Sequence, residues 1–164
     1  MSNTNILLKL SDNFDAWRDK LNSQANYIDT IFNIISPLIP SEKCTDITDA
    51  GFFVAIDTTS QDEKYIKATN PKTIIGVRCG EAYIKKELDV NTNVEVPKSY
   101  FLISSTGIVN AKIIGKINKG DEIVLSTTKG VGRKYISGDN EKNIIGFALE
   151  TNQSEGIKLV KIKI

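Results

Sequence analysis

Hydrophobic residues recur at a strict seven-residue spacing through the first 35 positions, and this feature constrains the fold more than any other. With Leu7 as the first a position, eight of the nine a and d positions are apolar, while the f positions are all Asp or Asn. A spacing of 3.5 residues is typical of a coiled-coil seam. The nine seam positions, which are also the predicted oligomerisation residues, are Leu7, Leu10, Phe14, Trp17, Leu21, Gln24, Ile28, Ile31 and Ile35.

The residues of the seam also bear on how many chains would associate. Isoleucine occupies both an a and a d position, at Ile28 and Ile31, which favours trimers over dimers. A three-stranded coil, or a helix docked on the chain's own β domain, would cover the wide apolar face of the last turns. The seam therefore predicts a homotrimer, and a single amphipathic helix packed on the sheet of a monomer remains the alternative. The flanking apolar positions are Ala25, Tyr27, Phe32 and Ile34.

The dipeptide Ser36-Pro37 separates two different kinds of sequence. A residue before proline is pushed out of the α region, so the helix is expected to end here, and Pro40 repeats the stop. Beyond it, short runs rich in β-branched residues alternate with turn residues. We therefore predict a mainly β fold, with an N-terminal α-helical coiled coil in residues 1–40 followed by a β-sandwich or small β-barrel domain in residues 41–164.

Ten short strands are expected from Gly51 onward. Turn signals separate them, among them the run Asn118-Lys119-Gly120-Asp121. The expected strands are Gly51–Asp57, Lys64–Thr69, Thr73–Cys79, Ala82–Leu88, Tyr100–Ser104, Ile108–Ile117, Glu122–Ser126, Val131–Ile136, Ile144–Glu150 and Gly156–Ile164.

Two details of the strand sequences predict local irregularity. The triplet Ile-Ile-Gly occurs at 74–76, 113–115 and 144–146, and a glycine in a strand marks a bulge, a bend or a close backbone approach. In the last strand the apolar alternation changes phase between Leu159 and Val160, which suggests a further bulge. The same strand is apolar to its end and is therefore expected to pair inside a sheet.

Composition and charge exclude several classes of function. The 164 residues carry 21 basic and 20 acidic side chains, and this balance argues against a nucleic-acid partner. The absence of histidine excludes histidine-based zinc sites, Ser-His-Asp hydrolases and Cys-His proteases. Two cysteines make neither a disulfide scaffold nor a four-sulfur metal site, and no apolar run would span a bilayer. We therefore expect no enzymatic activity, cofactor, metal or membrane, and a chain with reduced thiols and no signal peptide.

Several stretches resemble parts of chemical sites. The loop Thr127–Lys134 has glycines and basic residues, but its spacing is not that of a phosphate-binding loop, and a surface hairpin is predicted instead. Asp121 and Glu122 are adjacent in an extended segment, so they are expected to point to opposite faces and not to act together as acid and base. The acidic residues Asp57, Asp62 and Glu63 lack the spacing of a calcium loop.

Cysteines and paired aromatic residues have a structural interpretation as well. Cys44 and Cys79 have no histidine to activate them, and Cys79 is expected to be a buried small hydrophobe. The pairs Phe52-Phe53 and Tyr100-Phe101 could stack against nucleic-acid bases, but no basic groove surrounds them in the sequence. Core packing is the prediction for both aromatic pairs.

Two stretches resemble proteins of tailed bacteriophages. The segment Leu10–Asn22, with Phe14, Trp17 and Arg18, resembles a stretch that opens a short coiled coil in many virion proteins. The segment Ala111–Val160 has the order strand, Lys-Gly-Asp turn, strand, glycine loop, Ile-Gly-x-Ala-Leu-Glu and final strand. It is similar to small β domains in phage decoration proteins, head fibres and tail-fibre termini.

The resemblance implies a non-enzymatic structural protein of the virion, assembled in the host cytoplasm. It would be a homotrimeric capsid decoration protein of the head-fibre or cement type. Its expected partners are copies of itself and the major capsid protein or another virion protein. One alternative is a tail-fibre or baseplate component whose β head binds a host receptor or glycan, with Tyr100, Phe101 and the loop Ser137–Asn140 as candidate contacts. The other is a self-cleaving chaperone domain, for which the chain shows no convincing cleavage dyad.

Overall fold

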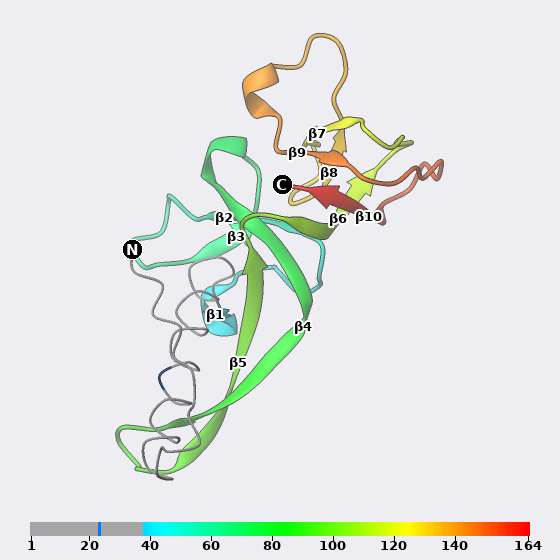
Figure 1. The fold of residues 1–164 in the computed structure, drawn as a ribbon. Helices are drawn as coiled ribbons and strands as arrows, with labels where there is room; N and C mark the ends of the chain where they lie inside the picture. Colours follow the sequence, from blue (N-terminus) through cyan, green and yellow to red (C-terminus); the bar gives the residue numbers. More distant parts are fainter. Residues whose placement is uncertain (1–22, 24–37) are drawn as a thin grey trace, which may run out of the picture. The chain divides into compact units, whose positions relative to one another are not determined.

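The structure is a computed structural model that describes residue 23 and residues 38–164 (Figure 1). The chain divides into two units after Ile35, and the account below concerns the second, Ser36–Ile164. All nine heptad positions lie outside the described residues, so the coiled coil and its oligomerisation residues stay predictions.

The described chain is mainly β, which confirms that part of the expected fold class. Three short 3-10 helices, η1 (Ser41–Lys43), η2 (Pro71–Thr73) and η3 (Glu141–Asn143), lie between strands of the described part. Its strands are β1 (Leu38–Pro40), β2 (Phe53–Ile56), β3 (Tyr65–Lys67), β4 (Ile74–Leu88), β5 (Glu95–Ser104), β6 (Ile108–Ile114), β7 (Glu122–Leu125), β8 (Gly132–Lys134), β9 (Gly146–Ala148) and β10 (Lys158–Lys163).

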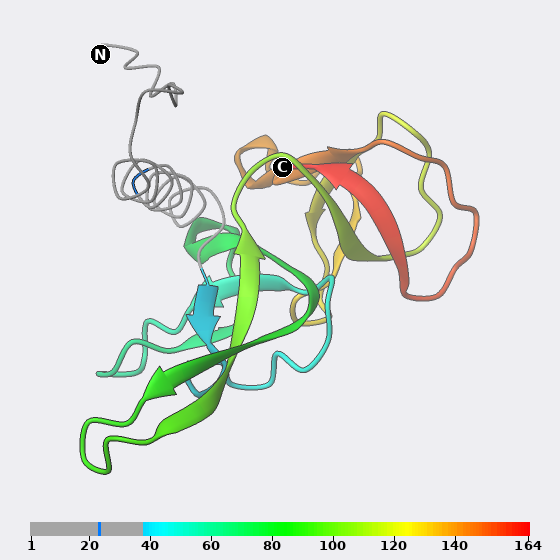
Figure 2. The ribbon, with the colours of Figure 1, turned by 60° about the horizontal axis from the view of Figure 1, so that its bottom comes forward.

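The first five strands form one antiparallel sheet in the order β1-β5-β4-β2-β3. The last five strands close into a barrel in the order β10-β6-β8-β7-β9 (Figure 2). Within the barrel only β6 and β8 run parallel, and the other neighbours are antiparallel. The small β-barrel is thus present in residues 108–163. The five-stranded sheet that precedes it is a separate element that the sequence did not distinguish.

Strand β4 corrects the predicted strand boundaries. The expected strands Thr73–Cys79 and Ala82–Leu88 are one continuous strand of 15 residues. Its register with β5 shifts between Cys79 and Tyr83, because β4 takes four steps there while β5 takes two. Gly80 lies in this bulge with φ of 60°, so the glycine interrupts the pairing without ending the strand.

Two hydrophobic clusters hold the second unit together. The larger joins the inward residues of the barrel to Phe53, Ala55 and Val77 of the sheet, so barrel and sheet share one core. The smaller cluster consists of Ile39, Ile47, Val54 and Ile103, with Phe101 packed against it. The alternation of strand side chains explains this division, because residues on opposite faces of the sheet contribute to different clusters.

The last strand is regular, and the expected bulge is wrong. Residues 158–163 of β10 pair with residues 113–108 of β6 without a register shift. Val160 and Ile162 point inward, whereas Leu159 is half exposed and lies against Gly51. The apolar residue at 159 belongs to the outer face, and this explains the change of phase without an inserted residue. The expected pairing of the chain end is confirmed, because β10 lies between β6 and β9.

The Ile-Ile-Gly triplets have different local roles. Gly76 lies at a register shift between β2 and β4, which is a bulge. Gly146 allows a close backbone approach, because a Cβ there would lie 2.3 Å from the carbonyl oxygen of Lys163. Gly115 follows the end of β6 with φ of 78°. The three triplets therefore do not share one local bend, although Gly76 and Gly146 do mark a bulge and a close backbone approach.

Candidate functional site

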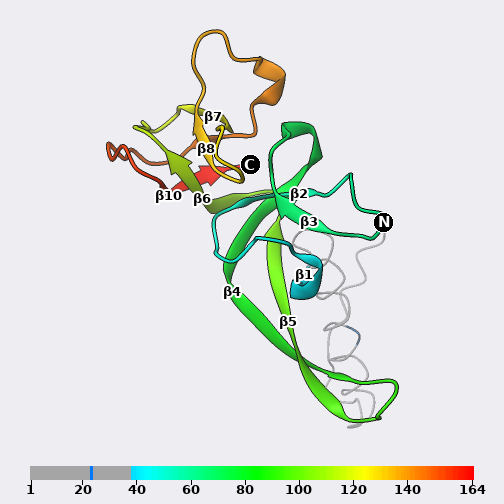
Figure 3. The same cartoon turned by 180° about the vertical axis from the view of Figure 1, so that it is seen from behind.

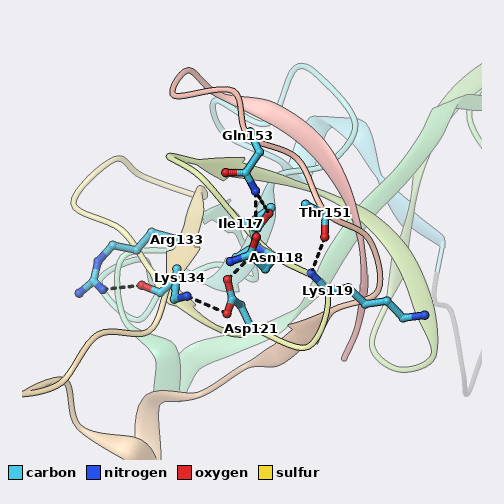
Figure 4. Close-up of polar contacts among 8 residues, drawn as sticks. All are labelled: Ile117, Asn118, Lys119, Asp121, Arg133, Lys134, Thr151 and Gln153. Carbon is cyan, nitrogen blue, oxygen red and sulfur yellow. Dashed lines mark hydrogen bonds and ion pairs between the residues drawn. The ribbon is translucent and has the colours of Figure 1, made fainter.

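The turn at residues 118–121 is the centre of a polar network on the barrel (Figure 4). The amide of Asn118 donates to Asp121 Oδ2 at 2.7 Å, and Lys134 Nζ donates to Asp121 Oδ1 at 2.8 Å. On the other side of the turn, Gln153 Nε2 donates to Asn118 Oδ1 at 2.8 Å, and the Lys119 amide donates to Thr151 Oγ1 at 3.0 Å. The predicted turn is confirmed, and its side chains connect β7, β8 and the segment after β9.

The carboxylate of Asp121 is 16% exposed and has both oxygens engaged. Partial burial acts to raise its pKa, but the hydrogen bonds from Lys134 and Asn118 outweigh burial, and the pKa is lower than usual. Glu122 is exposed beside it. An ionised Asp121 with both oxygens engaged is a structural anchor of the turn and the hairpin.

Arg133 and Asp139 form a second anchor beside β8. The guanidinium donates from both terminal nitrogens to the two carboxylate oxygens, at 2.7 and 2.6 Å. The Ile136 amide adds a bond to Asp139 at 2.8 Å. The pKa of Asp139 is lowered to about 2, and the largest cause is the hydrogen bonding from the Arg133 side chain. This bidentate pair fixes the loop Ser137–Asn140 against β8.

These contacts decide the interpretation of the basic loop Thr127–Lys134. Residues 122–125 and 132–134 are the two strands of an antiparallel hairpin, as predicted. Gly132 faces the core, where a Cβ would lie 2.7 Å from Ile113 and 2.8 Å from Ile123. Arg133 and Lys134 direct their charges to Asp139 and Asp121. The glycine of the strand therefore serves packing, and both cations hold carboxylates of the chain itself.

The remaining acidic candidates are separated by their own contacts. Asp57 accepts bonds from the amide and hydroxyl of Thr59, at 2.9 and 2.7 Å. Glu63 pairs with Lys43 and Tyr65. Within the part of the chain that the structure describes, no group of three or more His, Cys, Asp or Glu side chains could hold a metal ion.

Both cysteines are half-buried free thiols. Burial is the largest cause that raises the pKa of Cys44, to about 11, and burial also raises the pKa of Cys79. Cys79 packs against the larger hydrophobic cluster and Cys44 against the smaller one. The thiols therefore lie in surroundings that disfavour the nucleophilic thiolate.

The aromatic pairs take part in packing and in cation–π contacts. Phe53 is in the larger core, as predicted. Lys67 and Lys112 place their ammonium groups 4.2 and 3.9 Å from the centre of the Phe52 ring. Arg78, which is 5% exposed, places its guanidinium 3.9 Å from the ring centre of Phe101. These rings are covered by side chains of the same chain.

Strands β4 and β5 extend beyond the rest of the sheet as a two-stranded hairpin, which we call the arm and define as residues 83–100 (Figure 3). Asp89 closes its turn, because Oδ1 accepts from the amides of Asn91 and Thr92, both at 2.9 Å. The arm exposes several large apolar side chains at Tyr83, Ile84, Leu88, Val90 and Val94. This surface was not predicted, although the turn signal Asp-Val-Asn-Thr-Asn at 89–93 was present in the sequence.

Comparison with protein-family models and with curated proteins found no match for the chain. Among the described residues, no helix has the length and apolar character needed to cross a membrane. The arm is the candidate functional site, because five exposed large apolar side chains fall on one hairpin that the rest of the described chain leaves without a cover.

Proposed function

We propose that the protein is a non-enzymatic structural component of a tailed-phage virion, a homotrimer that decorates the capsid as a head fibre or cement protein. The observation that carries this proposal is the heptad seam of the first 35 residues, with apolar residues at eight of nine positions. A coil of this kind would gather three β bodies on one axis and multiply weak contacts to a symmetric shell.

The β body supports a static role. The charged side chains of its two polar anchors, Asp121 with Lys134 and Arg133 with Asp139, are ion-paired within the chain. The barrel closes on itself, which removes the exposed sheet edges that promote aggregation. A nearly neutral charge balance suits repeated side-by-side assembly.

Sedimentation equilibrium of the full chain tests the trimer. We expect about three times the chain mass of 18.1 kDa. Replacing two seam residues in the I28D/I31D variant should shift the mass towards a single chain. The matched control is N26D, which changes an f position away from the seam. A wild-type chain that stays monomeric at high concentration would contradict the proposal.

Two further experiments address the alternatives. Electron microscopy of virions labelled against this protein separates a capsid position from a tail-fibre or baseplate position. A glycan array tests the receptor-binding alternative, for which Tyr100, Phe101 and the loop Ser137–Asn140 were the candidate contacts. In the structure, Tyr100 bonds to Glu87, Phe101 packs under Arg78, and Asp139 binds Arg133.

Intact mass of the purified chain tests self-cleavage, and we expect one species at full length.

A further inference from the structure

The arm is a two-stranded element with both backbone edges open among the described residues. Strand β4 pairs with β2 only through residues 74–77, and β5 pairs with β1 only through residues 100–102. Residues 83–88 and 95–99 therefore pair only with each other. A two-stranded hairpin without a packed face is marginally stable at best in water, so this geometry calls for a further partner.

The two faces of the arm differ in chemistry. One face carries Tyr83, Lys85, Glu87, Val96, Lys98 and Tyr100. On it Tyr83 is 55% exposed, and Glu87 accepts from the Tyr100 hydroxyl and lies 3.3 Å from Lys98 Nζ and 3.8 Å from Lys85 Nζ. This face satisfies its charges within the chain. The cross-strand pairs place Ile84 and Leu88 on the opposite face, with exposed fractions of 60% and 58%. We call this opposite face the apolar face; its residues are Ile84, Lys86, Leu88, Glu95, Pro97 and Ser99.

The apolar face continues into the smaller core. Along β5, Ser99, Phe101 and Ile103 lie on one face of the strand, and Phe101 is paired with Ile39 of β1. Ile39 and Ile103 belong to the smaller cluster, and Phe101 packs against it. The apolar face is thus the uncovered extension of a hydrophobic cluster that begins beside β1.

The short link between the last seam position and β1 limits which partners can reach the apolar face. Ile35 is the last seam position, and Leu38 is the first residue of β1. Three residues span at most about 11 Å, so a coil formed by three chains would hold three β1 strands near its axis. Each β1 strand is paired with the β5 strand that continues into an arm. The arms of the other copies would therefore be present at a high effective concentration.

The charges of the apolar face fit a copy of the same face. Lys86 and Glu95 lie on it, and within residues 38–164 neither has an ion-pair partner. Around the threefold axis of the proposed trimer each contact between arms is heterologous, so Lys86 of one copy can lie against Glu95 of the next, while Ile84 and Leu88 of the three copies bury one another's surface. A surface of this composition is self-complementary in charge.

We propose that the apolar face of the arm binds the arm of a second copy of this chain, so that the arms of the oligomer pack together. This inference rests on the proposed trimer and names a second contact within it. The arm contact adds buried apolar area and an intermolecular ion pair beyond the N-terminal seam. It also supplies the packing partner that the hairpin lacks.

Cross-linking between different chains tests the contact directly. A tagged K86C chain is co-expressed with an untagged E95C chain, and both are purified at full length. A disulfide between the two has the summed mass of both chains and cannot form within one chain. We expect this species under mild oxidation. The controls are tagged and untagged wild-type chains, which report any link through Cys44 or Cys79, and the pair K86C with I108C, because Ile108 is exposed on the barrel.

Sedimentation equilibrium measures the contribution of the arm to assembly. The I84D/L88D variant should raise the dissociation constant of the oligomer by about tenfold or more. Each substitution removes apolar surface that the contact between arms would bury, and this weakens association. The control I108D changes a comparably exposed isoleucine on the barrel and should leave the constant unchanged. Far-UV circular dichroism of each variant checks that the β body remains folded.

The outcomes separate the two proposals. A monomeric wild-type chain removes the trimer and the arm contact together. A wild-type trimer with no K86C–E95C link, and with an unchanged dissociation constant for I84D/L88D, keeps the trimer and overturns the arm contact. In that case the apolar face belongs to another virion protein or to the chain's own N-terminal segment.

Discussion

Lys134, the last residue of β8, places Nζ 2.8 Å from Oδ1 of Asp121, the residue just ahead of β7. The pair connects the two strands of a hairpin at the point where the turn at residues 118–121 is closed by the Asn118 amide. One carboxylate therefore secures both the hairpin and the turn.

Replacing this carboxylate should destabilise the β body. In D121A the Asn118 amide and Lys134 lose their partner, and we expect the free energy of unfolding to fall by about 1–3 kcal/mol. Urea denaturation monitored by circular dichroism measures the loss. The exposed neighbour offers a control, because E122A should change stability by only about 0.5 kcal/mol. Equal effects of the two substitutions would show that Asp121 is not an anchor.

The Arg133–Asp139 pair predicts a loss of stability in acid. The pKa of Asp139 is about 2 in the folded chain, lower than the usual value of about 3.9 for the unfolded chain. A carboxylate with a depressed pKa contributes stability above the unfolded pKa, and that contribution is lost as the pH falls towards the folded pKa. Thermal midpoints measured from pH 6 to pH 2 should decline most below pH 4. The decline should be smaller in D139N. An equally large decline below pH 4 in that variant would contradict a contribution from Asp139.

The close approach of β10 to Gly146 predicts that a side chain at this position would destabilise the closed barrel. A Cβ at this position would lie 2.3 Å from the Lys163 carbonyl oxygen, so G146A forces β9 and β10 apart. We expect G146A to lower the free energy of unfolding by about 1–3 kcal/mol. G156A is the matched control, because nothing lies within 4 Å of a Cβ built there. Denaturant unfolding of both variants compares the two positions, and equal stabilities would refute the close approach.

The raised pKa of Cys44 predicts that its thiol reacts slowly with disulfide reagents. With a pKa of about 11, roughly 0.1% of this thiol is ionised at pH 8, compared with about a quarter for an unperturbed cysteine. In a C79S background, the reaction of Cys44 with a disulfide reagent at pH 8 should be at least about a hundredfold slower in the folded protein than in urea. Similar rates in the two conditions would mean that Cys44 is not desolvated.

Sequence patterns predicted the local structure of the β body well. The turn at 118–121, the hairpin of the basic loop, the pairing of the last strand and the burial of Phe53 all followed from residue types and their spacing. These features depend on neighbours in the chain, because turn chemistry and alternation act over a few residues. Two predictions failed, namely the end of a strand at Cys79 and the bulge between Leu159 and Val160. Gly80 interrupted no strand, and Leu159 marked an outward-facing apolar position instead of a bulge.

What the sequence by itself determined is the β character of residues 41–164, most of its strands and its turns, because these follow from short-range patterns; strand β1 at 38–40 lay in the part predicted to be helical. Only the tertiary structure decided that the strands divide into an open sheet and a closed barrel, that Lys134 meets Asp121, and that residues 83–100 form an uncovered arm. Each of these relationships pairs residues that are distant in the chain or depends on strand order. A periodic pattern shows which face of a strand is apolar, but it does not show what lies opposite that face.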